Sequence, residues 1–125
     1  MNTIEKRIQA YLSKIPKQKV ELSDVQEFLK YYIGVETFGK NIDIDEKEIS
    51  KHLEKTETLK RSLRVDLEDM KEDMERLAVG IKRAETAAKS LGVSPKEIPN
   101  YNKAVNAMKY GTKQEAKAKQ LLKSI

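Results

Sequence analysis

The chain has 125 residues, and 25 Lys and Arg against 20 Asp and Glu give it a formal net charge of +5. Hydrophobic residues make up only 38% of it and charged residues 36%, so a large globular core is not expected. Five Tyr, two Phe, five Gly and three Pro are too few for a turn-rich β-sandwich or for a low-complexity segment. These proportions predict an all-α fold.

The residue types also exclude several kinds of functional site. The chain has no Cys and a single His, which excludes disulfides, thiolate metal centres and multi-histidine clusters within one chain. It contains no phosphate loop, dinucleotide fingerprint or nucleophile elbow. We therefore expect a protein that is not an enzyme, with no catalytic residues, no metal and no cofactor.

Targeting signals are missing from the sequence as well. The N-terminus lacks the apolar core of a signal peptide, and no stretch approaches the roughly 18 apolar residues that cross a bilayer. The sequence therefore predicts a cytoplasmic protein, in a nucleoid or in a host cytoplasm, with no membrane partner.

Residues 1–40 are predicted to form a small N-terminal helical pair. The first helix presents one apolar face and ends near Pro16; this face consists of Ile4, Ile8, Tyr11, Leu12 and Ile15. The second helix begins at Ser23, with Gln26 completing a capping box. Its apolar face consists of Val25, Phe28, Leu29, Tyr32 and Ile33. Gly34 and Gly39 are then expected to loosen the chain, and the pair is expected to pack around the start of a long helix.

A winged-helix arrangement is an alternative for the same region. Residues 46–54 would then form the recognition helix of a DNA-binding N-terminal domain, and the long helix would serve for coiled-coil dimerisation. However, Glu46, Glu48 and Glu54 would face phosphates, and residues 33–45 are too many for a tight turn.

The segment 41–92 predicts one long coiled-coil helix over about residues 45–91. Asp45 is suited to the N-cap, with Glu48 three residues on. Gly92 follows the last apolar residue, where helices commonly end in a left-handed conformation. Gly80 interrupts the interior at a cost of about 1 kcal/mol relative to Ala and marks a bend or a close contact.

Apolar residues recur in this segment at 3-4 spacing, the pattern of a coiled-coil seam. Eleven of the fourteen a and d positions are apolar, and the last four heptads are unbroken. A continuous rod of this length, about 70 Å, must cover its seam with another copy or with helices of its own chain. We expect self-association, as a homodimer or a higher oligomer. The candidate oligomerisation residues are Leu53, Leu63, Leu67, Met70, Met74, Leu77, Ile81, Ala84 and Leu91.

The segment 93–125 predicts short basic helices. Ser94 is an N-cap, followed by Pro95 in the first turn, and Pro99 limits this helix to about one turn. A second helix starts at Asn100 and is expected to end at Gly111. Thr112 and Glu115 then cap a last helix that runs to about Ser124.

This last segment contains seven Lys against two acids and no Arg. Lysine is a point charge that suits phosphate rather than base edges, and Asn and Tyr side chains lie among these lysines, as at many nucleic-acid interfaces. The competing interpretation is the ordinary solvated face of an amphipathic helix. The candidate nucleic-acid-binding residues are Lys96, Asn102, Lys103, Asn106, Lys109, Lys113, Lys117, Lys119 and Lys123.

A long heptad helix, the string AAKSLGVSPKEI at residues 87–98, and lysine-rich helices after it together resemble the GapR-type nucleoid-associated DNA-binding proteins. The resemblance covers roughly residues 60–125. It implies that the coiled coil oligomerises and that the basic helices clamp around duplex DNA through its backbone. The phosphate contacts that it implies are Lys96, Lys103, Lys109, Lys113 and Lys117.

Two hypotheses follow for function. In the first, an all-helical coiled-coil oligomer binds nucleic acid, mainly duplex DNA, through its C-terminal lysines with little sequence preference. In the second, the chain is a structural, adaptor or inhibitor protein, such as a viral assembly or host-targeting factor, whose helical rod binds a protein partner.

Overall fold

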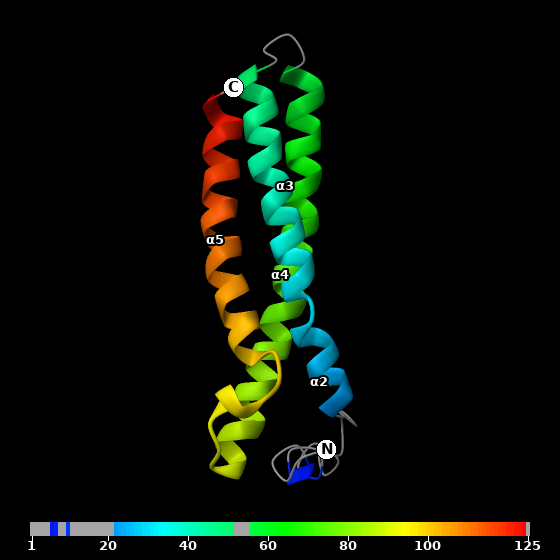
Figure 1. The fold of residues 1–125 in the computed structure, drawn as a ribbon, viewed down its shortest axis with the longest axis vertical. Helices are drawn as coiled ribbons and strands as arrows, with labels where there is room; N and C mark the ends of the chain where they lie inside the picture. Colours follow the sequence, from blue (N-terminus) through cyan, green and yellow to red (C-terminus); the bar gives the residue numbers. More distant parts are fainter. Residues whose placement is uncertain (1–5, 8–9, 11–21, 52–55, 125) are drawn as a thin grey trace.

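The computed structural model describes residues 6–7, 10, 22–51 and 56–124. The elements in chain order are α2 (Leu22–Leu29), α3 (Tyr32–Lys51), α4 (Thr56–Leu91), the short 3-10 helix η2 (Pro95–Glu97) and α5 (Tyr101–Ser124). This part of the chain has no strand, which confirms the all-α fold. Three long helices lie side by side in an elongated bundle, and α2 continues the line of α3 along α4 (Figure 1).

The long helix is confirmed over residues 56–91, but the prediction is wrong for residues 45–51. Those residues are the last turns of α3, which runs antiparallel to α4 (Figure 1). The apolar residues of α3 and of α4 recur with the same 3-4 spacing. The sequence pattern therefore looks like one continuous helix and does not mark the end of α3. Residues 46–51, which the winged-helix alternative assigns to a recognition helix, therefore belong to the bundle.

The predicted oligomerisation seam is covered within the single chain. Leu63, Met70, Leu77 and Ala84 are fully buried, Leu67 and Met74 nearly so, and Ile81 and Leu91 are partly buried. Leu53 lies outside the described residues. The core that covers the seam comes from the other helices: Val25, Leu29, Val35, Ile42, Ile49, Ala104, Ala107 and Ala118. The seam therefore does not require a second copy, and self-association would have to use another face.

The glycines of the N-terminal third do not loosen the chain, contrary to the prediction. Gly34 and Gly39 both lie inside α3. A side chain at Gly34 would meet the Asp73 carboxylate, and one at Gly39 would meet the ring of Tyr110. Glycine at these two positions thus lets α3 approach both α4 and α5.

The predicted second helix, which was to collect residues from Val25 to Ile33, is divided. α2 ends at Leu29 and α3 begins at Tyr32, and Ile33 is exposed instead of belonging to the core. Most of the predicted first helix, residues 4–15, lies outside the described residues. Its described residue Arg7 donates a hydrogen bond to the carbonyl of Leu91, 2.9 Å away, at the C-terminus of α4.

The turn after α4 confirms the local signals of the sequence. Gly92 has a φ of 67°, and the amides of Gly92 and Val93 donate to the carbonyls of Lys89 and Ala88 as in a Schellman motif. The side chain of Ser94 accepts a hydrogen bond from the amide of Lys96, so it caps η2 as predicted.

The predicted break at Gly111 is wrong, because α5 is one continuous helix of 24 residues. Gly111 is buried, and a side chain there would collide with Met74 and Val35. The Thr112 hydroxyl donates to the carbonyl of Met108 one turn earlier and so does not cap a new helix. Gly111 therefore allows close packing of α5 against its neighbours and does not terminate a helix.

Asp45, the predicted N-cap, is a buried residue inside α3 that faces α4. Its Oδ2 has no hydrogen-bond partner among the described residues. Burial, together with the neighbouring Asp66 carboxyl, raises the pKa of Asp45 to about 7. The folded chain is therefore more stable when the Asp45 carboxyl is protonated than when it carries a negative charge beside Asp66.

Gly80 marks the close contact of α2 with α4. A methyl group there would lie 2.7 Å from Phe28 Cβ and 3.1 Å from the backbone nitrogen of Leu29. Although Ala is the better helix former by about 1 kcal/mol, we expect Gly80→Ala to lower the free energy of unfolding by about 1–2 kcal/mol through overpacking. Urea unfolding followed by circular dichroism measures the change. The control Thr58→Ala, at an exposed position of α4, should raise the free energy of unfolding slightly. A higher free energy of unfolding for Gly80→Ala would contradict the close contact of α2 with α4.

Asp45 predicts a pH dependence of stability. The pKa of Asp45 is about 7 in the folded chain, against 3.8 for a free aspartate side chain. Its contribution to the free energy of unfolding is therefore complete below about pH 3.8 and is lost as the pH rises through 7. Compared with wild type, Asp45→Asn should therefore gain about 1–2 kcal/mol in unfolding free energy between pH 4 and pH 8. Urea unfolding at several pH values measures this difference. Glu68→Gln, an exposed change on α4, should leave the pH dependence unchanged, and equal behaviour of the two variants would refute the assignment.

Candidate nucleic-acid interface

α5 is attached to the bundle by a stripe of small residues. Ala104, Ala107, Gly111 and Ala118 are buried, and with the larger Gln114, also buried, they recur at 3-4 spacing. Small side chains let the α5 backbone approach α3 and α4 closely. Since one side of the helix is committed to this contact, the opposite side must face outward.

The outward side carries lysine and amide groups without a carboxylate. Asn102, Asn106, Lys109, Lys113 and Lys123 are exposed, and we refer to these five residues as the α5 lysine face. Their spacing places them along one side of the helix over about 32 Å. The one acid in α5, Glu115, is directed to α4, where it lies 4.0 Å from Lys71. Basic and amide donors are therefore gathered here with no charge to neutralise them on the same face.

Two other candidate lysines have partners within the chain. Lys117 lies 2.7 Å from Asp43 and 3.3 Å from Glu46, both on α3, and Lys119 lies 3.0 Å from Glu115. The hydrogen bond to Asp43 raises the pKa of Lys117, so this lysine stays charged and paired. A phosphate would have to displace these carboxylates to reach either lysine.

The remaining candidate lysines lie beside the α5 lysine face. Lys103 is exposed, and its Nζ stands 5.6 Å from the centre of the Tyr32 ring, a cation–π contact with α3. Lys96 is exposed on η2, before α5 begins. Neither has a carboxylate within ion-pair distance among the described residues, so both can extend the interface.

The two tyrosines among the lysines are taken up by the bundle. Tyr101 is buried, and its hydroxyl donates to Glu85 at 2.6 Å. Burial and this hydrogen bond raise the pKa of Tyr101 to about 12. Tyr110 packs against Gly39 of α3, and burial raises its pKa as well. These rings are therefore not available to stack on bases.

Gln114 is a positioning residue that the sequence reasoning missed. Its Nε2 donates to the carbonyl of Gly39 at 2.6 Å and to Oδ1 of Asp43 at 3.0 Å. This hydrogen bond, with that of Lys117, holds the pKa of the Asp43 carboxyl below its usual value. The contacts fix how α5 is rotated against α3. The 3-4 spacing of Gln114 with Gly111 and Ala118 could have revealed it, had α5 been expected to be continuous.

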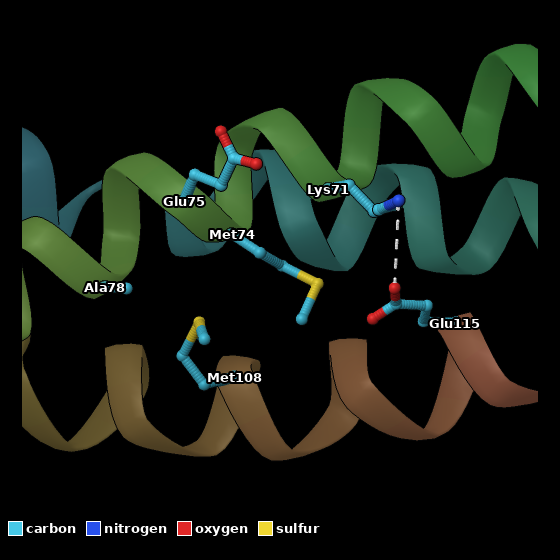
Figure 2. Close-up of a pocket in the computed structure, with 6 residues that line it drawn as sticks. All are labelled: Lys71, Met74, Glu75, Ala78, Met108 and Glu115. Carbon is cyan, nitrogen blue, oxygen red and sulfur yellow. Dashed lines mark ion pairs between the residues drawn. The ribbon is translucent and has the colours of Figure 1, made fainter.

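The structure also contains an apolar groove between α4 and α5. A hollow of about 280 Å³ is lined by Met74, Ala78 and Met108, with Lys71, Glu75 and Glu115 at its edges. Figure 2 shows Met74 and Met108 reaching into the hollow from opposite helices, and the ion pair of Lys71 with Glu115 at one end. This groove was not anticipated from the sequence, because it depends on the packing of α5 against α4.

Two further kinds of site have no candidate in this part of the molecule. The described residues hold no group of three or more His, Cys, Asp or Glu arranged for a metal ion. None of the helices described here has both the length and the apolar character that a bilayer crossing requires.

Comparison of the chain with protein-family models, with curated proteins and with solved structures finds no match. The resemblance to GapR-type proteins therefore stays a prediction from the sequence.

Proposed function

We propose that the protein is a non-enzymatic cytoplasmic protein that binds the phosphate backbone of nucleic acid, mainly duplex DNA, through the α5 lysine face. The observation that carries this proposal is the exposed row of Lys109, Lys113 and Lys123, without a carboxylate on the same face of α5. A helix face that is only solvated usually mixes both signs of charge, and this one does not.

The donor chemistry selects phosphate over base edges. Lysine ammonium groups act as mobile point charges, whereas base readout in the major groove relies largely on bidentate Arg, Asn or Gln. Asn102 and Asn106 add side-chain amides at the start of the same face, which suit phosphate and sugar oxygens. The interface should therefore bind with little sequence preference.

The charge of the bundle is distributed unevenly, which favours one orientation toward a polyanion. α5 carries six Lys and one Glu, whereas α3 carries three Lys and five Asp and Glu. The resulting field attracts a polyanion to the α5 side and repels it from α3. This asymmetry supports α5 as the binding side.

A protein partner is the second candidate function, and the groove between α4 and α5 favours it. Its floor includes methionines, which adapt to different partner surfaces, and its edges carry both signs of charge. An adaptor of this kind needs no nucleic acid, so the two functions give opposite results in a duplex-binding assay.

The lysine face predicts salt-sensitive binding. Fluorescence anisotropy with a short random-sequence duplex should show steep weakening of wild-type binding between about 50 and 200 mM salt. The combined change Lys109→Gln, Lys113→Gln and Lys123→Gln should weaken binding at least about tenfold and reduce the slope of log affinity against log salt by about 2.7, since each phosphate contact contributes about 0.9.

The matched control is the combined change Lys40→Gln, Lys47→Gln and Lys51→Gln on α3, which removes the same charge from exposed positions elsewhere. It should retain most of the affinity. Equal loss in the two triple variants would refute α5 as the interface. No binding by wild type even at low salt would refute the nucleic-acid function and favour the protein partner.

A further inference from the structure

The face of the bundle between α4 and α5 has no helix of its own chain on it among the described residues. Beside the hollow in Figure 2 lies a second one of about 500 Å³, and the two share Ala78 and Met108. The second hollow continues along the bundle to Ile81, Val105 and Tyr101. No residue of α3 lines either hollow. Together they form one groove with an apolar floor.

The charged residues of α4 along this groove lie on both sides of Ala78, and residues at similar distances from Ala78 on the two sides have opposite charges. Glu75 and Lys82 lie three and four residues to either side, and Lys71 and Glu85 each lie seven residues away. All four line the groove. Further out on the same side of the helix follow Glu68 and Lys89. Each acid on one side of Ala78 is thus matched by a lysine at about the same distance on the other.

Such a pattern is complementary to itself under a two-fold rotation. If a second α4 lies antiparallel on the first with the two Ala78 residues at the crossing point, Glu75 faces Lys82 of the second copy and Lys71 faces its Glu85. The two-fold repeats each pair. A parallel arrangement would instead set Glu75 against Glu75 and Lys82 against Lys82. Ala78, which is exposed and small, lets the helices approach at the centre.

We infer that the protein forms an antiparallel homodimer in which the groove between α4 and α5 of one copy docks on the same groove of a second copy. Contact of the methionine-lined floors excludes water, and the charge pairs at the edges set the orientation. The inference does not depend on nucleic-acid binding. Met74 and Ile81 of the heptad seam line this groove on the α4 side, and Lys109 of the α5 lysine face lines it on the α5 side. The other lysines of that face, Lys113 and Lys123, line neither hollow.

Glu75 and Lys82 provide the sharpest test, because neither has an ion-pair partner among the described residues and both are exposed. Sedimentation velocity of the full chain, without nucleic acid, should give a dimer at micromolar concentrations. Glu75→Lys should raise the dimer dissociation constant at least about tenfold, because it places two lysines opposite each other at both ends of the crossing. Lys82→Glu should have the same effect.

The combined variant Glu75→Lys with Lys82→Glu restores opposite charges and should recover the wild-type dissociation constant. Lys40→Glu, the same charge reversal as Lys82→Glu but at an exposed position of α3, which does not line the groove, should leave the dimer intact. Circular dichroism verifies that each variant is folded. A monomeric wild type, an unaffected Glu75→Lys variant, or failure of the combined variant to recover the dimer would each overturn the inference, whatever the outcome of the duplex-binding assay.

Discussion

Burial of the apolar stripe of α4 is the constraint on which the rest of the structure depends. A helix of 36 residues with one narrow apolar side cannot remain alone in water. The chain covers this stripe itself, with α2 and α3 on one flank and α5 on the other (Figure 1). Both flanking segments run antiparallel to α4. The surfaces left for partners are therefore the outer sides of the bundle and the groove that three helices leave open.

Small residues and a few polar contacts then determine which side chains reach those surfaces. Gly80, Gly39 and Gly111 lie where neighbouring helices approach closely. Gln114 and Lys117 join α5 to α3 and so fix the rotation of α5. This rotation separates lysines that look equivalent along the sequence into those that hold the bundle together and those that face outward.

Signals confined to a few residues could be predicted from the sequence, and contacts between distant segments could not. Gly92 and Ser94 act through their own backbone neighbours, and both have the predicted roles. The reversal between α3 and α4 has no such signal, because no Gly or Pro occurs between Asp45 and Val79 and the two apolar stripes share one spacing. Gly111 was misleading, since glycine suits a helix end and a tight helix contact equally well. The partners of Lys117 lie more than 70 residues away, which no local pattern encodes.

If the protein binds nucleic acid as proposed, the double ion pair of Lys117 limits how far a phosphate chain can spread over the molecule. Asp43 and Glu46 lie at the border between α5 and α3, and their charge is balanced only while Lys117 stays with them. A strand of nucleic acid that recruited this lysine would face two uncovered carboxylates. These two acids would therefore confine a bound strand to the outer side of α5. The width of that proposed interface would be set by a contact that also joins α5 to α3.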